Sequence, residues 1–225
     1  MLYRTTDVLE SAISLDNADS SPAVHDAIIV ERLFNSSLVV IVSQKEPRVI
    51  CIYHFKSKNM ICVYKFIKSV LNVKLNRDRV VVCLEDSIHI YVLKDMKLLH
   101  TILDTPLNRL GLIDLSPAGS SLIAYPASAE AGSVHIFDCM NLSAVNTFTA
   151  HDGPLACLKF NADGTMIATA STKGTVIRVY SVPQGTRLFE FRRGMSRYVP
   201  TTYIPFSVLC VLHQHFRHFS SCKSL

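Results

Sequence analysis

Short runs of apolar, β-branched residues recur along this chain at a nearly constant spacing. Four of them begin 42, 42 and 44 residues apart, as LVVIVS from Leu38, VVVCLE from Val80, LIAYPA from Leu122 and MIATAS from Met166. After a turn, each is followed by a second apolar run with an aromatic residue in the matching place, at Tyr53, Tyr91, Phe137 and Tyr180. Runs this short, with alternating polarity and many β-branched residues, predict strands rather than helices.

Two further candidate strands complete each repeat. An earlier run, AIIVERLF, VLNVKL, LGLIDL or LACLKF, joins the next through polar turns such as NSS, NRD, SPAGS and NADGT. An outer run, MICVYKF, KLLHTIL, SAVNTFTA or RLFEFRR, follows. Four strands recurring every 42 to 44 residues are typical of a β-propeller blade. We therefore predict an all-β, WD40-like β-propeller with about four four-stranded blades, at residues 28–67, 69–103, 107–149 and 151–194.

Composition is consistent with a protein that stays in a reducing compartment. Hydrophobic residues make up 49% of the 225 positions, which is enough to bury a sizeable core. The seven cysteines are odd in number and have no CxxC spacing, so we expect reduced thiols in a cytosolic protein. No signal-peptide pattern opens the chain, and no apolar run reaches the roughly 18 residues that span a bilayer. We expect a soluble or peripheral protein.

The net charge of +5 is concentrated near the end of the chain. Residues 187–225 hold six basic residues against Glu190 alone, whereas the rest of the chain holds 17 of each sign. The six are Arg187, Arg192, Arg193, Arg197, Arg217 and Lys223. This bias favours an anionic partner, either a lipid head group or a nucleic acid. The aromatic and basic interleaving of RNA-binding proteins is missing, so a nucleic-acid partner is not expected.

Motifs for catalysis and metal binding are absent from the sequence. It has no P-loop, no GxSxG, no HExxH and no carboxylate pair at a recognisable spacing, so we predict neither an enzyme nor a cofactor. The segment CVLHQHFRHFSSC holds Cys210, His213, His215, His218 and Cys222. Their spacing matches no recurrent zinc finger, so no metal site is predicted.

One repeat carries a specific resemblance. The fourth, AHDGPLACLKFNADGTMIATASTKGTVIRVYSVPQGTRLFEFRRG, resembles the PROPPINs, which are phosphoinositide-binding β-propellers that include the mammalian WIPI proteins of autophagy. Further support comes from IVERLFNSSLVVIVS, VKLNRDRVVVCLEDSIHIY, KDMKLLHTIL, IAYP and KGTVIRV, so the likeness covers residues 28 to about 198.

The sequence departs from this family at both ends. PROPPINs fold into seven blades, so the resemblance implies that the four repeats correspond to blades two to five of the family. Residues 1–27 would be a divergent remnant of the first blade. Residues 197–225 would form a divergent and poorly ordered tail. The chain therefore looks like a truncated form.

The resemblance also assigns the FRRG arginines. It implies that Arg192 and Arg193 each anchor one of two sites for phosphatidylinositol 3-phosphate or the 3,5-bisphosphate. Adjacent strand residues point to opposite faces, which suits two pockets, and guanidinium groups grip phosphate oxygens with paired donors. The residues that match the family's first pocket are His151, Thr169, Ser171, Gly174, Thr175 and Arg178.

The second pocket is incomplete in the sequence. Arg193 and Gly194 are present, but the Ser, Thr and His that the family takes from its next blade have no counterpart. The long loop by which family members insert into the bilayer is missing too. We therefore predict weak, salt-sensitive membrane binding.

Simpler explanations remain open for these residues. His151 is equally expected to brace the turn between two blades. Thr169, Ser171 and Thr175 would be ordinary strand and turn residues in another setting.

A second surface follows from the same resemblance. Autophagy partners of the family bind with acidic segments in the groove between its second and third blades. Here Lys74, Arg77, Arg79 and Lys94 would line that groove, although solvated charges on turns are equally expected.

The implied function is a non-catalytic effector and scaffold that recruits autophagy proteins to the forming autophagosome. It would be cytoplasmic, and peripheral on phagophore, autophagosome and endosomal membranes. The alternative is a form without lipid binding that acts only as an interaction scaffold or decoy. A third possibility is an unstable product, because open sheet edges favour aggregation.

Overall fold

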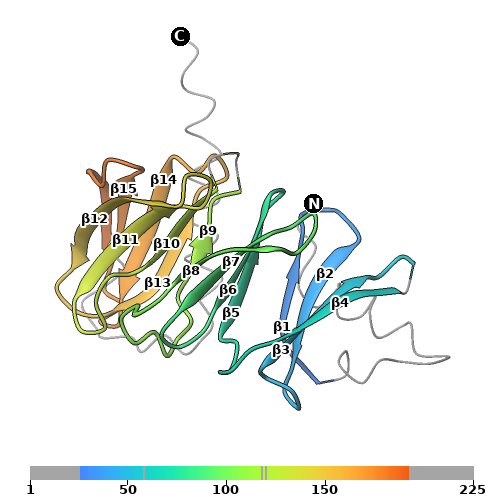
Figure 1. The fold of residues 1–225 in the computed structure, drawn as a ribbon. Helices are drawn as coiled ribbons and strands as arrows, with labels where there is room; N and C mark the ends of the chain where they lie inside the picture. Colours follow the sequence, from blue (N-terminus) through green and yellow to red (C-terminus); the bar gives the residue numbers. More distant parts are fainter. Residues whose placement is uncertain (1–25, 58, 118, 120, 193–225) are drawn as a thin grey trace, which may run out of the picture. The chain divides into compact units, whose positions relative to one another are not determined.

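The part of the chain that the structure describes contains sixteen strands, joined by turns and loops, and no helix. The structure is a computed structural model, and it describes residues 26–57, 59–117, 119 and 121–192. The strands form four antiparallel sheets of four, and in each sheet neighbours along the chain are neighbours in space (Figure 1). This meander is the arrangement of a β-propeller blade, so the predicted all-β propeller class is confirmed.

The strands of the first two sheets lie between residues 27 and 102. The first sheet contains β1 (Ala27–Arg32), β2 (Leu38–Ser43), β3 (Val49–His54) and β4 (Asn59–Lys65). The second contains β5 (Asn72–Leu75), β6 (Arg79–Cys83), β7 (Ile88–Val92) and β8 (Leu98–Ile102).

The other two sheets follow from residue 114 onward. The third sheet contains β9 (Asp114–Leu115), β10 (Leu122–Pro126), β11 (Gly132–Asp138) and β12 (Ser143–His151). The fourth contains β13 (Leu155–Phe160), β14 (Met166–Ser171), β15 (Val176–Ser181) and β16 (Arg187–Arg192).

The repeated apolar runs become the second strand of each sheet, namely β2, β6, β10 and β14. In β2 all of Val39–Val42 are buried, so both faces of the strand are covered. A strand buried on both faces needs a continuous apolar run, whereas the outer β4 alternates between exposed and half-buried residues near its end. Position within the sheet therefore explains why the two patterns differ.

The first strand of the third sheet is shorter than the sequence suggests. LGLIDL was predicted to pair along its length, but only Asp114 and Leu115 do so. The side chain of Asn108 accepts a hydrogen bond from the Leu112 amide and donates one to the Leu112 carbonyl. Gly111 adopts a left-handed φ of 58°. The preceding residues are thus held in a turn, which keeps them out of the ladder.

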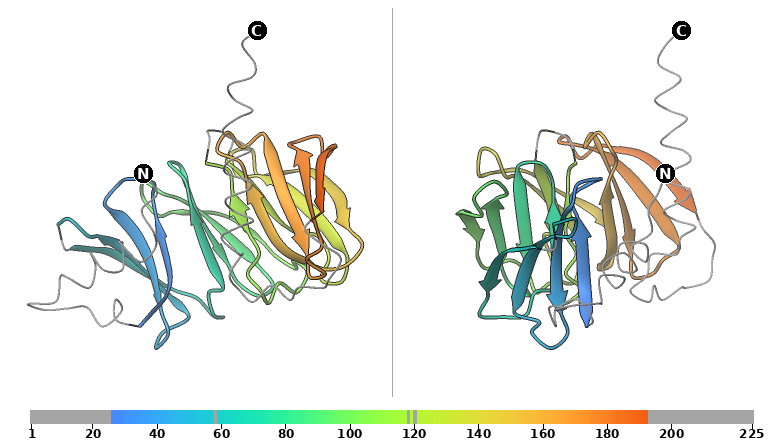
Figure 2. Two further views of the ribbon diagram at one scale, coloured as in Figure 1. Left: turned by 180° about the vertical axis from the view of Figure 1, so that it is seen from behind. Right: turned by 90° about the vertical axis from the view of Figure 1, so that its right-hand side faces the viewer.

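The chain divides into two compact units, residues 1–103 and 104–225. In the first, Val40 and Ile50 of the first sheet share a core with Val73 and Val80 of the second. In the second, Ala124 and Ile136 of the third sheet share a core with residues of the fourth, including Ile167. Within each unit, the two sheets therefore stand side by side (Figure 2).

A buried carboxylate also joins the third and fourth sheets. Asp114 accepts hydrogen bonds from Lys159 Nζ and from the Phe160 amide, each at 2.7 Å. The buried charge is thereby both neutralised and hydrogen-bonded, as burial requires.

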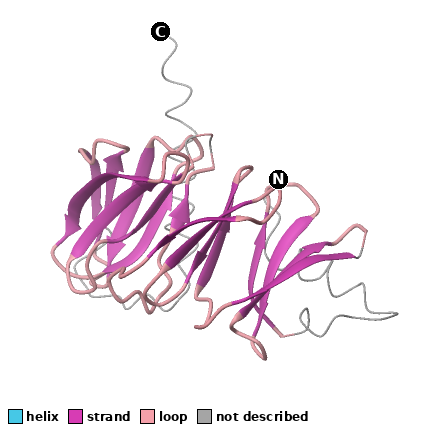
Figure 3. Ribbon diagram, in the orientation of Figure 1, coloured by secondary structure: helices cyan, strands magenta, loops and turns pink. Residues whose placement is uncertain are grey.

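No helix that could cross a membrane occurs among the described residues, since every regular element there is a strand (Figure 3).

Candidate anion-binding site

The predicted first-pocket residues lie on the fourth sheet and at the end of the third. In the pairing of β15 with β16, Arg178 opposes Glu190 and Val176 opposes Arg192. Paired residues and those two apart along a strand share a face, so Arg178, Glu190 and Arg192 lie together. Arg193 and Gly194 lie outside the described residues.

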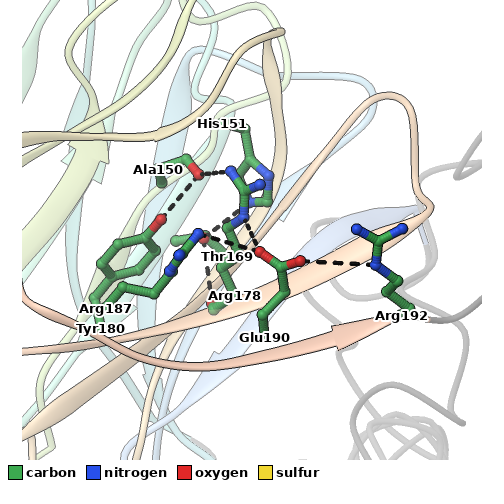
Figure 4. A network of polar contacts seen from close by, with 8 residues as sticks. All are labelled: Ala150, His151, Thr169, Arg178, Tyr180, Arg187, Glu190 and Arg192. Atoms are coloured by element: carbon green, nitrogen blue, oxygen red, sulfur yellow. Dashed lines mark hydrogen bonds and ion pairs between the residues drawn. The ribbon is translucent and has the colours of Figure 1, made fainter.

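Glu190 is the centre of an arginine cluster (Figure 4). Its Oε2 accepts a hydrogen bond from Arg178 Nε at 2.9 Å and one from Arg187 Nη1 at 3.2 Å. Its Oε1 lies 3.8 Å from Arg192 Nε, an ion pair without a short hydrogen bond. These arginines keep the pKa of the Glu190 carboxyl below its usual value, with the Arg178 hydrogen bond as the largest cause.

Arg178 is fixed on two sides. Besides Glu190, its Nη1 contacts the Ala150 carbonyl oxygen at 2.7 Å, and that oxygen also accepts the Tyr180 hydroxyl at 2.9 Å. The Arg178 side chain is 23% exposed, whereas that of Arg192 is 82% exposed. One guanidinium is therefore held in place, and the other faces solvent.

His151 and Thr169 contact each other behind Arg178. Thr169 Oγ1 donates to the Arg178 carbonyl oxygen at 3.3 Å, and His151 Nε2 lies 3.0 Å from the same hydroxyl. Burial lowers the pKa of His151, and the charge of Arg178 lowers it further. The ring is a 5% exposed brace between β12 and β14.

Ser171 ends β14, and Gly174 and Thr175 lie in the turn that follows, before β15. The Gly174 amide donates to the Ser171 carbonyl at 2.9 Å, and Gly174 has a left-handed φ of 67° that favours glycine. Thr175 precedes Val176, the residue that pairs with Arg192. The turn and Arg192 are therefore at the same end of the sheet.

Glu190, Arg187 and Tyr180 were not among the predicted site residues. The sequence did show Glu190 as the one acid among six basic residues. An antiparallel register between the last two strands would have placed it opposite Arg178, but the bulge between Val179 and Tyr180 is not visible in the sequence. Finding Glu190 from the sequence would have required the pairing register of β15 with β16.

The second predicted surface lies in the first unit. Lys74 Nζ donates to Glu31 Oε2 of β1 at 3.2 Å, and the Arg77 guanidinium lies 5.8 Å from the ring centre of Phe34. Arg79 opposes Val92, and the Leu93 amide donates to the Asp78 carbonyl at 2.9 Å. The exposed Lys94 follows directly. The four predicted cations therefore lie at one end of the second sheet, where β5 and β7 end and β6 begins. They are Lys74, Arg77, Arg79 and Lys94.

No group of three or more possible metal ligands occurs within the ranges that the structure describes. The cysteines and histidines of residues 210–222 lie outside those ranges.

The four described sheets are β-propeller blades, and the arginine cluster lies on the fourth of them. A family model described as PROPPIN matches residues 3–221. The chain therefore belongs to the PROPPIN family. The match extends beyond residues 28–198, where the sequence resemblance was placed.

Named relatives agree with the family. The chain is 59% identical over 210 residues to autophagy-related protein 18 of Caenorhabditis elegans, covering 92% of this chain and 51% of that protein. It is 50% identical over 201 residues to human WD repeat domain phosphoinositide-interacting protein 1, covering 89% and 45%. The chain thus spans about half the length of the curated relatives it matches.

Solved structures share the fold. KlAtg21, in a complex with the coiled coil of AgAtg16, superimposes with a TM-score of 0.67 at 28% identity, covering 79% of this chain and 60% of that one. Hsv2 of Kluyveromyces lactis gives 0.65 at 26% identity, covering 76% and 52%.

Proposed function

We propose that this chain is a non-catalytic phosphoinositide-binding protein of autophagy and that the Glu190 cluster is its head-group site. One observation carries the proposal: an anchored Arg178 and an 82% exposed Arg192 lie on the same sheet face. Arg178 offers hydrogen-bond donors that are held in place, and Arg192 offers donors that face solvent. Phosphate oxygens can accept hydrogen bonds from both guanidinium groups.

The proposed ligands are phosphatidylinositol 3-phosphate and the 3,5-bisphosphate. The Gly174 turn and the hydroxyls of Ser171 and Thr175 lie at the same end of the sheet as Arg192, where they would meet the inositol ring. We assign the second head-group site to Arg193 and Gly194. The human relative is named as phosphoinositide-interacting, which supports this ligand class.

The proposed place of action is the surface of phagophore, autophagosome and endosomal membranes, with the protein otherwise cytoplasmic. There it would recruit autophagy proteins by receiving an acidic segment at Lys74, Arg77, Arg79 and Lys94. The solved complex of KlAtg21 with the AgAtg16 coiled coil supports an autophagy protein as the partner.

A scaffold or decoy without lipid binding is the alternative. It is favoured by the contact between His151 and Thr169, because the hydroxyl that could meet a ligand already bonds the Arg178 carbonyl. The basic surface of the first unit does not depend on these residues.

Flotation of the purified, folded chain with liposomes tests the lipid site. The vesicles contain either phosphatidylinositol 3-phosphate or phosphatidylserine at equal total charge. We expect flotation with the phosphoinositide only, and a reduction of about tenfold in Arg192→Ala, the scale of one charge-assisted hydrogen bond.

Arg48→Ala is the matched control, since it removes an exposed arginine from the first unit. Equal loss in both variants would reduce the effect to net charge. Absence of flotation from the folded wild-type chain would leave the scaffold alternative.

A further inference from the structure

Glu190 is the only acidic residue in 187–225, yet it sits among three arginines. Its side chain is 27% exposed, so it is not sealed from solvent. A carboxylate in this position offers the arginines what a phosphate would offer them, namely negatively charged acceptor oxygens. The cluster therefore already contains an anion of its own.

The three contacts of Glu190 are not equivalent. Arg178 Nε donates to Glu190 Oε2 at 2.9 Å, and its Nη1 donates to the Ala150 carbonyl oxygen at 2.7 Å. These two hydrogen bonds hold the Arg178 side chain in place. Arg192 Nε lies 3.8 Å away, beyond hydrogen-bond distance, on an exposed side chain. Arg192 is consequently the partner that an incoming anion would take from Glu190.

The net charge of the cluster also favours an anionic ligand. Arg178, Arg187 and Arg192 bring three positive charges against Glu190 and the nearby Asp152, so an excess of positive charge attracts anions. The fixed carboxylate nevertheless repels a phosphate that approaches the same donors. Attraction and repulsion therefore act at one place, and Glu190 sets their balance.

We propose that Glu190 is an internal counter-ion of the head-group site, which holds Arg178 in position and competes with a bound phosphate for Arg192. This inference rests on the proposed function and assigns a residue that limits its affinity. The arginines alone would bind the phosphate more tightly than the cluster does. The resident carboxylate would thus make binding depend on a ligand strong enough to displace it.

Glu190→Gln separates the two roles. The amide keeps an oxygen that accepts from Arg178 and Arg187 but removes the negative charge. We expect binding to phosphatidylinositol 3-phosphate vesicles to become about three- to fivefold tighter, the range of exposed ion pairs, with a smaller gain at high salt. Unchanged or weaker binding would overturn the proposal and leave Glu190 as a structural residue only.

Two comparisons make the result specific. Asp163→Asn removes one negative charge from an exposed turn between β13 and β14 of the same unit. An equal gain there would attribute the effect to net charge and overturn the proposal. In an Arg192→Ala background, Glu190→Gln should give a much smaller gain, because the competition for Arg192 is gone and only the relief of charge repulsion remains. A full gain in that background would also overturn it.

A soluble probe distinguishes this inference from the proposed function. Titration with inorganic phosphate, followed by the NMR signals of the arginine Nε–H groups, needs no membrane. If the vesicles fail to bind either protein, the lipid function fails, but tighter phosphate binding by Glu190→Gln would still support the counter-ion. Equal phosphate titrations of the two proteins would overturn it.

Discussion

The basic surfaces of the two units differ in how their cations are paired. In the first unit, Lys74 has one carboxylate, Glu31, and Arg77 lies over the Phe34 ring. In the second, Arg178, Arg187 and Arg192 share Glu190. A cation paired one-to-one with a carboxylate, as Lys74 is with Glu31, is largely neutralised, whereas three that share one carboxylate leave excess charge. The difference explains why the second surface is the stronger candidate for a phosphate.

Replacing Arg178 should produce the largest difference between the two units. Arg178→Ala removes the contacts with Glu190 and Ala150, and we expect the free energy of unfolding to fall by about 2 kcal/mol, the range for charged hydrogen bonds. Lys74→Ala, which removes a one-to-one pair, should cost less than about 1 kcal/mol. Urea denaturation of both variants measures this. Equal losses would contradict the comparison.

Acidification should lower the stability of both units through their buried histidines. Burial lowers the pKa of His89 in the first unit and of His135 and His151 in the second. The unfolded chain, in which histidine has its ordinary pKa near 6.5, therefore binds protons that the folded chain does not. The free energy of unfolding therefore keeps the full contribution of these histidines above pH 6.5 and declines as the pH falls below that value.

Urea unfolding at several pH values between about 7.5 and 5 tests this sign. His151→Gln should show a weaker decline than the wild-type protein, because one of these histidines is gone. A wild-type stability that is constant over the range would show that the folded and unfolded histidines titrate alike.

The smallest effect is expected from Glu31→Gln, the counterpart of Glu190→Gln in the first unit. It frees only Lys74, whose side chain is 20% exposed, so phosphoinositide flotation should change by less than about twofold. A gain as large as that of Glu190→Gln would mean that the two surfaces respond alike to lost carboxylates.

The repeat was readable in the sequence because the second strands are buried on both faces, which requires continuous apolar runs such as Val39–Val42. The shortness of β9 was not readable, since LGLIDL has the polarity of a strand. Its length is set by the hydrogen bonds of Asn108 with Leu112 and by the conformation of Gly111. Polarity predicts which residues can pair, while local turns decide which of them do.

The candidate site was predictable in its residue types but not in its contacts. Motif resemblance indicated His151, Thr169, Arg178 and Arg192, and the structure places them on or beside one sheet face. The same residues did not reveal that His151 bonds Thr169 or that Glu190 accepts from Arg178. Both contacts depend on strand register.

The class of this protein can be inferred from the sequence, because the period of its apolar runs and the FRRG pattern are local properties of the chain. Which arginine is anchored and which is exposed depends on how the sheets pack. Arg178 is fixed because the Ala150 carbonyl, 28 residues earlier, lies within 2.7 Å of it. Contacts between residues so far apart arise when the sheets pack, because packing joins chain segments that no sequence pattern links.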